Sequence, residues 1–369
     1  MGAETPRRGR HSSAPYAIGP DSAGWGIVGA SRVAAPLFIE ALRSMPPHAD
    51  GTVAARVISI FSHSPFQAHQ FASTYSVPHA DRELDVLLSR HEIRHVYVAN
   101  HPRHHAESVL AALRAGKHVL CEPPLALSHD EALHLHEAAR SRGLTLALNY
   151  QHRLDPALLA LRRRIAAHEL GDLVAALVRN VTLLPPSQQT WRVDAASGGV
   201  LFERALRTVD MVRFIFGEEI GRVTAFAGPD VLGHGKGSAA AVEDLHTLLQ
   251  LRSSGAVIQA HTSYLAPHAP SRIDVEGSAA ACTVSPLREH ESSTLYLWRS
   301  GEASEIPVTA LHLWRESLAA YHLAATSGNP PPASSVDDII NRDVCEAIAG
   351  SLHTGSAQVP TLQSGLIKS

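Results

Sequence analysis

The chain has 369 residues, a length that suits two domains of ordinary size rather than one. Hydrophobic residues make up 45% of it and charged residues 18%, which is typical of a soluble globular protein rather than a disordered one. The formal net charge of -3 does not favour nucleic-acid binding, and no apolar run approaches the roughly 20 residues of a membrane span, so we expect a cytoplasmic protein with a small-molecule substrate and no membrane or nucleic-acid partner.

Residues 1–22 are rich in Gly, Pro, Ser and Arg without apolar periodicity, and we expect them to form a disordered tail. In residues 23–149, short apolar runs alternate with helical patterns, as they do in a parallel sheet covered on both faces. This predicts an N-terminal Rossmann domain whose ligands bind at the carboxyl ends of its strands. The predicted strands lie near 26–29, 56–61, 95–99, 118–121 and 145–148, and the predicted helices near 35–44, 65–75, 82–90, 106–115 and 129–142.

The pattern changes after Asn149. A helical segment at 156–167 is followed by segments that alternate between apolar and polar residues or are continuously apolar. They lie near 173–184, 221–227, 243–252, 255–264, 272–276, 279–284 and 293–299. We therefore expect residues 150–369 to form an α+β domain for substrate binding and oligomerisation, with a large, mostly antiparallel sheet and C-terminal helices that pack back on the first domain.

A turn of small residues follows the first predicted strand. Gly29 to Ala34 has the spacing of the G-x-G-x-x-G/A motif, with Ser31 and Ala34 in the second and third glycine positions. Small residues let backbone N–H groups and a helix N-terminus approach a pyrophosphate. A glycine between a strand and a helix is often only a turn, but its place in the βα series favours a dinucleotide site that includes Gly29, Ser31, Arg32 and Val33.

The end of the second predicted strand bears on the choice of cofactor. An Asp or Glu there would bind the ribose 2′-hydroxyl of NAD, but the sequence has Ser62-His63-Ser64. With Arg32 nearby, this slightly favours NADP over NAD and makes Ser62 and His63 candidate cofactor contacts. A solvated loop explains the same residues equally well.

Three sequence runs resemble a known family. Residues 114–124 read RAGKHVLCEPP, residues 149–156 read NYQHRLDP, and WRVD at 191–194 is followed by SGGVL at 197–201. They resemble the GKHVLCEKP motif, the opening of the second domain and the WR…GGGxL stretch of the glucose-fructose oxidoreductase/inositol dehydrogenase/rhizopine-catabolism (Gfo/Idh/MocA) family, over about residues 24–217. The resemblance implies an NAD(P)-binding first domain, a second domain that binds sugars, cyclitols or related molecules, and homo-oligomers that pair through its open sheet face.

The chain departs from this family at the residues that catalyse the reaction. Pro123 stands in place of the lysine that assists proton transfer, while Glu203 and Arg207 stand at the family's acidic and histidine positions. Proline has no side-chain donor, and arginine stays protonated, so neither replaces the lost acid/base. The chain has three lysines, and only Lys236, in a Gly-rich segment, is a candidate substitute for the missing one. General acid/base catalysis is typically worth about 10²–10⁴-fold, so its loss makes the standard reaction doubtful.

Four residues are candidates for a different catalytic chemistry. Glu203 is a possible base, and the Arg207 guanidinium is suited to binding a substrate carboxylate or stabilising an enolate. Being four residues apart, they would share one helix face, and a pair that merely stabilises the helix is an equally good interpretation. Tyr150 and His152 lie at the predicted domain junction, where either side chain can deliver a proton to a carbonyl, although packing is the commoner role there.

Other residues are candidates for cofactor contacts or were considered as metal ligands. His105 matches a histidine in the family's strand-to-helix turn, and Asn100 and Glu122 stand at neighbouring strand ends, so all three are candidate cofactor contacts. The chain has 24 histidines spread along its length, and its three cysteines lie far apart. Only His101, His104 and His105 form a close group in sequence, and we expect no metal site.

Three functions therefore remain open. The first is an NAD(P)-dependent oxidoreductase that acts on a small sugar-like or specialised-metabolite substrate without the usual lysine and histidine. The second is a non-redox enzyme on the same fold, catalysing a cyclisation, elimination or isomerisation. The third is a noncatalytic sensor of a dinucleotide or another ligand. Hydride transfer would indicate the first function, turnover without redox change the second, and ligand binding without turnover the third.

Overall fold

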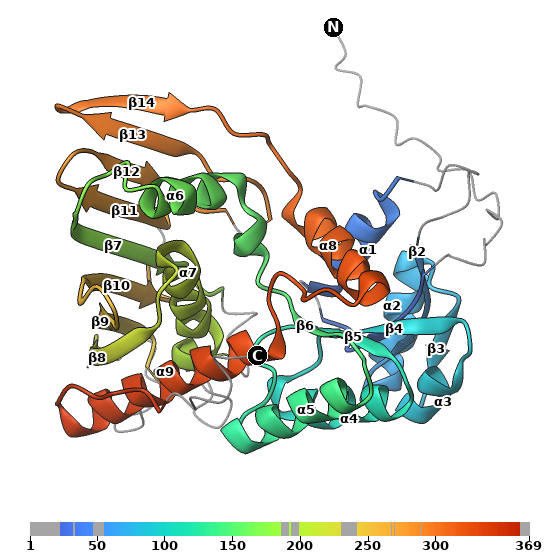
Figure 1. Ribbon diagram of the computed structural model, residues 1–369. Coiled ribbons are helices and arrows are strands. Elements are labelled where there is room, and N and C mark those ends of the chain that lie inside the picture. The colour runs from blue at the N-terminus through green and yellow to red at the C-terminus, as the bar shows by residue number, and fades with distance from the viewer. Residues whose placement is uncertain are drawn as a thin grey trace, which may run out of the picture.

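The structure is a computed structural model, and it describes residues 23–31, 34–46, 55–185, 192, 199–229, 242–266, 268, 270–288 and 290–361. The predicted tail at 1–22, the candidate cofactor residues Arg32 and Val33, and Lys236 lie outside these ranges. The described residues form two sheets that lie next to each other, each with its own helices (Figure 1). No helix among them is both long and apolar enough to cross a membrane.

The first sheet has six parallel strands in the order β3-β2-β1-β4-β5-β6. This is the Rossmann order, which reverses direction between β1 and β4. The strands are predominantly apolar because helices cover both faces of such a sheet, and Ile27, Val96 and Tyr97 are fully buried. The strands are β1 (Ala23–Val28), β2 (Ala55–Phe61), β3 (His79–Asp81), β4 (Ile93–Val98), β5 (His118–Cys121) and β6 (Leu146–Leu148).

The helices between these strands begin at residues suited to capping. Ser64 accepts a hydrogen bond from the backbone N–H of Gln67, and Pro65 occupies the first turn of the following helix. Ser128 accepts one from Glu131 in the same way. The helices are α1 (Ala34–Arg43), α2 (Pro65–Tyr75), α3 (Leu84–Ser89), the 3₁₀ turn η1 (Pro102–His104), α4 (His105–Arg114) and α5 (His129–Ser141).

The second sheet has eight strands in the order β14-β13-β12-β11-β7-β10-β9-β8, antiparallel except for the parallel pair β7 and β10. It confirms the predicted large, mostly antiparallel sheet. The strands are β7 (Leu173–Val181), β8 (Ile220–Ala227), β9 (Asp244–Leu251), β10 (Val257–Ser263), β11 (Arg272–Gly277), β12 (Ala281–Val284), β13 (Leu295–Arg299) and β14 (Glu302–Ile306).

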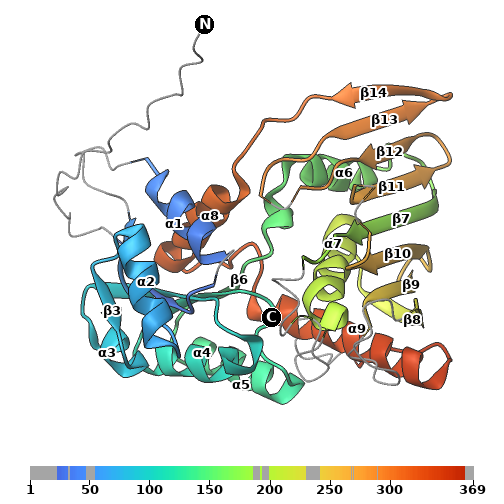
Figure 2. The same ribbon diagram turned by 180° about the vertical axis from the view of Figure 1, so that it is seen from behind.

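The two faces of the second sheet differ. Along β9, Leu245, Thr247 and Leu249 are buried, while His246 and Leu248 on the opposite face are exposed. Helices α6 (Pro156–Ala166) and α7 (Leu206–Phe216) pack on the buried face, on the side toward the Rossmann sheet (Figures 1 and 2). Among the described residues, the outer face stays open.

The last two helices connect the two sheets. Helix α8 (Leu313–Ser327) packs on α1, and its Tyr321 ring lies 5.1 Å from that of Trp25 on β1. Helix α9 (Ser335–Thr354) begins with a capping box formed by Ser334 and Asp337, and it contacts both α5 and β8. The second sheet is therefore held against the Rossmann sheet by helices α8 and α9.

Candidate active site

The candidate residues of the first domain follow the carboxyl ends of its strands. Gly29 follows β1, Asn100 lies two residues after β4, Glu122 follows β5, and Asn149 follows β6. Because parallel strands end at one edge of the sheet, the fold brings these residues to a common edge. This is the edge that faces the second sheet's helix α7, which carries Arg207.

The turn after β1 is shaped for a close backbone approach. Gly29 has φ +110°, and a Cβ added there would lie 2.4 Å from the backbone nitrogen of Asn100, so only glycine fits. The backbone N–H of Gly29 donates to the carbonyl of Phe61 at 2.8 Å, which ties the turn to β2. Ser31 then accepts a hydrogen bond from the backbone N–H of Ala34, at the start of α1.

The other candidate cofactor residues lie around this edge. Ser62 is buried and accepts a hydrogen bond from the backbone N–H of Ser64, while the exposed His63 ring stacks on His104 at 4.2 Å. Asn100 donates to the Ser108 hydroxyl at 2.9 Å, and its own side-chain oxygen is buried without a hydrogen-bond partner.

The predicted histidine group does not converge on one point. His105 is buried, and its two ring nitrogens lie 2.6 Å from the carbonyl of Pro124 and 3.1 Å from that of Asn100. Burial lowers the pKa of this histidine. In this position it bridges the ends of β4 and β5, while the His101 and His104 rings lie 6.2 Å apart outside the core.

Glu122 is the centre of a polar cluster between the two sheets. Its Oε1 accepts hydrogen bonds from the Tyr97 hydroxyl at 2.8 Å and from the Asn149 amide at 2.5 Å. Its Oε2 forms an ion pair of 2.9 Å with Arg207, which also donates to the Asn149 carbonyl at 3.3 Å. A guanidinium from α7 therefore lies beside the carboxylate that precedes Pro123.

Glu203 has its own partners in the second sheet. It lies in the π-helical turn η6 (Leu201–Ala205), which leads into α7. The Tyr264 hydroxyl donates to its Oε2 at 2.5 Å, and Arg192 Nε lies 3.6 Å from its Oε1. Burial and the charge of Glu203 raise the pKa of Tyr264 well above its usual value, so this hydroxyl keeps its proton.

His152 is hydrogen bonded to a buried carboxylate. It lies in the turn η2 (Gln151–Leu154), and its Nε2 is 2.7 Å from Oδ2 of Asp210 on α7. Asp210 also accepts hydrogen bonds from Nε and Nη2 of Arg153, at 2.9 and 2.6 Å. Burial acts to raise the pKa of Asp210, but the charge of Arg153 and the hydrogen bonds from His152 and Arg153 outweigh it and hold the pKa well below its usual range. The carboxylate that contacts His152 is therefore ionised.

Tyr150 connects the Rossmann part to α9. Its hydroxyl donates to Oδ1 of Asp338 at 2.6 Å, and its side chain is buried. Burial, together with the charge of Asp338, raises the pKa of Tyr150 well above its usual value. Asp338 also accepts a hydrogen bond from the backbone N–H of Leu125, so the contact joins the segments after β5 and β6 to α9.

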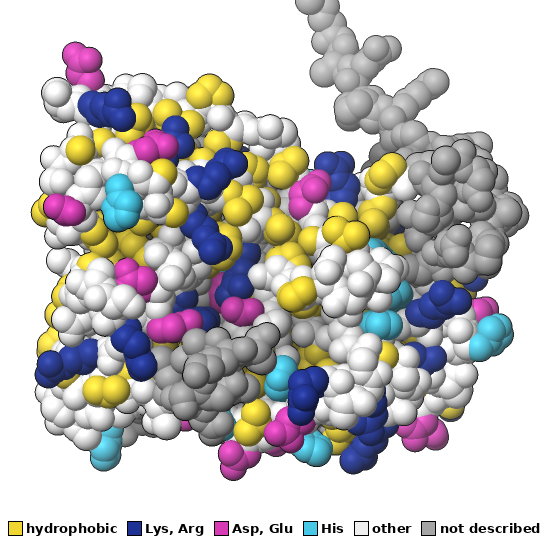
Figure 3. Space-filling model, in the orientation of Figure 1, with side chains coloured by type: hydrophobic (Ala, Val, Ile, Leu, Met, Phe, Trp, Pro, Cys, Tyr) yellow, Lys and Arg dark blue, Asp and Glu magenta, His cyan; other side chains and the backbone are white. Residues whose placement is uncertain are grey.

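One cavity of about 790 Å³ extends from the turn after β1 to the second sheet, a size within the roughly 300–1,000 Å³ of small-molecule sites. Its wall includes Ser31, Glu122, His152, Glu203 and Arg207, whereas Gly29, Ser62, His63, Asn100, His105 and Tyr150 lie outside it. Figure 3 shows basic and acidic side chains gathered between the two halves of the molecule. The structure thus brings together five of the eleven predicted site residues that it describes.

Sequence reasoning missed several residues of this site. Tyr264 follows β10, and Asn180 on β7 accepts a hydrogen bond from Arg204 at 2.7 Å; all three side chains line the cavity. Asp210 was missed as the partner of His152. No motif marks Tyr264 or Asn180, because strand pairing alone places them. Asp210 lies three residues after Arg207, and a buried acid at that position of an amphipathic helix was an available signal.

Comparison with known proteins supports the same assignment for both halves. Residues 23–150 match the family described as "Oxidoreductase family, NAD-binding Rossmann fold". Residues 158–283 match the "GFO/IDH/MocA C-terminal domain".

The curated relatives include an anhydro-sugar reductase and a dihydrobenzene-diol dehydrogenase. The 1,5-anhydro-D-fructose reductase of Ensifer adhaerens is 28% identical over 345 residues, which cover 93% of this chain and 99% of that protein. The trans-1,2-dihydrobenzene-1,2-diol dehydrogenase of Macaca fascicularis is 33% identical over 199 residues, covering 52% of this chain and 56% of the relative.

Solved structures share the whole fold at low sequence identity. The aldose-aldose oxidoreductase of Caulobacter crescentus, complexed with glycerol, has a TM-score of 0.81 at 18% identity and covers 92% of this chain and 99% of its own. A point mutant of KijD10, a 3-ketoreductase from Actinomadura kijaniata in complex with TDP-benzene and NADP, has a TM-score of 0.78 at 22% identity and covers 90% of this chain and 98% of its own.

Proposed function

Because the chain belongs to the Gfo/Idh/MocA family of NAD(P)-dependent oxidoreductases, we propose that it transfers hydride between a nicotinamide dinucleotide and a small sugar-like or specialised-metabolite substrate, without the family's lysine and histidine. The substrate class is carried over from relatives such as 1,5-anhydro-D-fructose reductase. The observation that carries the proposal is the cavity that joins Ser31, in the dinucleotide turn, to Glu203 and Arg207 of the second domain.

The Rossmann edge fits a dinucleotide. Gly29 lets the turn after β1 lie against the backbone of Asn100, and the cavity reaches Ser31 and Ala34 at the N-terminus of α1. When bound, the nicotinamide ring donates or accepts the hydride. Ser62 and His63 offer no carboxylate at the end of β2, which favours NADP over NAD.

In this proposal, Arg207 and His152 together replace the missing lysine. The Arg207 guanidinium is anchored on Glu122 and lines the cavity, where its positive charge stabilises the oxygen of a substrate carbonyl as hydride adds to the carbon. His152 lines the same cavity, and its Nε2 contact with Asp210 leaves Nδ1 for the substrate side. We assign His152 the proton that this oxygen takes up in reduction and releases in oxidation.

Glu203 and Tyr150 have positioning roles in this scheme. Tyr264 and Arg192 hold the Glu203 carboxylate at the cavity wall, where it accepts hydrogen bonds from substrate hydroxyl groups. Tyr150 fixes α9 through Asp338, outside the cavity. Its contribution to catalysis is therefore the geometry of the neighbouring Gln151 and His152.

The test combines calorimetry with a turnover assay. The cofactor-free protein is titrated with NADPH, NADH, NADP and NAD, and the NADPH complex is then mixed with keto-sugars, including 1,5-anhydro-D-fructose, while nicotinamide absorbance is followed. We expect micromolar binding, tighter for the phosphorylated pair, and oxidation of NADPH by at least one sugar. Absence of binding by all four nucleotides contradicts the proposal and leaves the non-redox enzyme; tight binding without any turnover favours the sensor.

We also propose a homo-oligomer formed through the open face of the second sheet. Phe226 on β8, Leu248 on β9 and Val257 on β10 are exposed on this face, as the strand pairing with His246 and Gln250 indicates. Burying such apolar area favours self-association. Light scattering should give a mass above that of the 39.5 kDa chain, and a monomer would refute this arrangement.

A further inference from the structure

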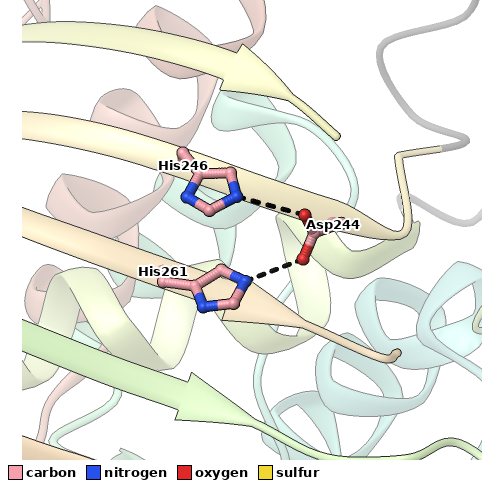
Figure 4. Close-up of side chains that lie close together, drawn as sticks. All are labelled: Asp244, His246 and His261. Atoms are coloured by element: carbon pink, nitrogen blue, oxygen red, sulfur yellow. Dashed lines mark hydrogen bonds and ion pairs between the residues drawn. The ribbon is translucent and has the colours of Figure 1, made fainter. Parts of the chain in front are cut away.

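Three side chains that commonly bind metals lie together on the outer face of the second sheet (Figure 4). Asp244 and His246 are two residues apart on β9, so they point to the same face. His261 on β10 is the residue paired with His246 in the antiparallel register. The buried neighbours Leu245 and Thr262 point the other way, toward α7 and the cavity side.

The donor atoms lie close together. His246 Nε2 lies 3.1 Å from Oδ2 of Asp244, and His261 Nε2 lies 2.8 Å from its Oδ1. All three ligand atoms lie within 4.8 Å of one another. Two imidazole nitrogens and one carboxylate oxygen are a donor set that Zn²⁺ and similar divalent transition metals bind, with a fourth position open to water.

The surroundings hold the carboxylate in place and leave the site accessible. The backbone N–H of Gly228 donates to the Asp244 carbonyl at 2.8 Å, and a Cβ on Gly228 would lie 2.3 Å from Oδ2. The Asp244 carboxylate therefore occupies space that only glycine leaves free. The His246 side chain is 54% exposed, whereas that of Asp244 is 15% exposed, so in a single chain an ion reaches the histidines from solvent.

From this arrangement we infer that Asp244, His246 and His261 form a binding site for a divalent transition-metal ion of the Zn²⁺ type, separate from the catalytic cavity. The two rings are stacked at 4.4 Å with an interplanar angle of 4°. One ion does not lie in the planes of two parallel rings, so binding requires the rings to tilt, and the exposed His246 has room to do so. The ion replaces the two histidine-aspartate hydrogen bonds and joins β9 to β10.

The experiment is a titration of the full chain, stripped with a chelator, with Zn²⁺ alone. The histidine-rich chain also has background sites, so the stoichiometry of the double variant His246→Asn and His261→Asn is compared with that of wild type. His91→Asn is the control, because His91 is an exposed histidine in the Rossmann part. We expect wild type and H91N to bind one more Zn²⁺ per chain than the double variant. Equal stoichiometry and affinity in all three proteins would overturn the inference. The three residues would then only connect β9 and β10 through hydrogen bonds.

A second variant tests the metal site without removing a ligand, in case the double variant misfolds. Gly228→Ala changes no ligand but pushes against the Asp244 carboxylate, so it should also weaken the extra site. Co²⁺ bound to wild type should show the visible absorption of a four-coordinate N/O site, and this absorption should be absent in the double variant. Binding of NAD(P)H should be unchanged in all of these variants, since the site lies on the outer face. The test of the metal site is therefore independent of the test of the proposed function.

Discussion

His152 shows how the environment of one residue changes its role. In sequence it is a histidine at a domain junction, where packing is the usual explanation. In the structure it lines the cavity with Nε2 on Asp210, a buried carboxylate that Arg153 keeps ionised. An ionised partner fixes the orientation of the ring, and a fixed ring is what the proposed acid/base role requires.

Replacing His152 by Asn should therefore lower kcat by about 10²–10⁴-fold, the usual value of general acid/base catalysis. The reason is the lost proton transfer, so the dissociation constant for NADPH should stay as in wild type. The measurement is kcat for both proteins, followed by nicotinamide absorbance, with nucleotide affinity from calorimetry. A wild-type kcat in H152N would assign the proton transfer to another group.

At the scale of elements, the strand-to-helix turn at Gly29 depends on the sheet around it. The motif Gly29 to Ala34 is local, but the reason for its first glycine is not, because the clash that excludes a side chain comes from Asn100 after β4. The same applies to Glu122, which needs β4, β6 and α7 to supply Tyr97, Asn149 and Arg207. A motif thus marks the position of a turn, while neighbouring elements decide its shape.

Gly29→Ala should abolish nucleotide binding and lower the thermal midpoint. Alanine at φ +110° is strained by about 1–2 kcal/mol, and its Cβ would also clash with the Asn100 backbone at 2.4 Å. Gly116→Ala is the matched control, because Gly116 has φ +73° but nothing within 4 Å of an added Cβ. Thermal unfolding and NADPH titration of both variants separate strain from clash. Wild-type nucleotide affinity in G29A would show that this turn does not hold the cofactor.

At the scale of the whole molecule, buried histidines make stability depend on pH. His95 on β4 and His322 on α8 flank Trp25, whose indole donates to His322 Nε2 at 3.3 Å. Burial and the nearby His322 and His118 lower the pKa of His95 to about 3, and burial lowers the pKa of His322 to about 4. These two histidines are neutral in the folded protein and take up protons only on unfolding.

Stability should therefore be full above the unfolded histidine pKa of about 6.5 and should fall as the pH drops below it, by about 1.4 kcal/mol per histidine per pH unit. At pH 5 this amounts to about 2 kcal/mol for each of the two. The measurement is the urea unfolding free energy at pH 7.5 and pH 5 for wild type and for His95→Asn with His322→Gln. The double variant should have a lower unfolding free energy than wild type at pH 7.5, but that free energy should fall less between pH 7.5 and pH 5. An equal loss in both proteins would remove these histidines as the cause.

The sequence by itself determined the family and most of the elements, although not the strands β3 and β14. The βα alternation from Gly26 to Leu148 predicted the Rossmann sheet because apolar runs and helical periods are local properties, and the runs at 114–124 and 149–156 predicted the Gfo/Idh/MocA fold. The replaced positions Pro123, Glu203 and Arg207 are also visible in sequence alone.

Only the tertiary structure decided which side chains contact one another. Arg207 pairs with Glu122 from the other sheet, Glu203 with Tyr264 61 residues away, and His246 with His261 across two strands. These contacts depend on strand register and on how α7 and α9 dock, which are set by packing between distant segments. Local sequence carries no record of such distances, so it offered candidate residues but not which of them meet.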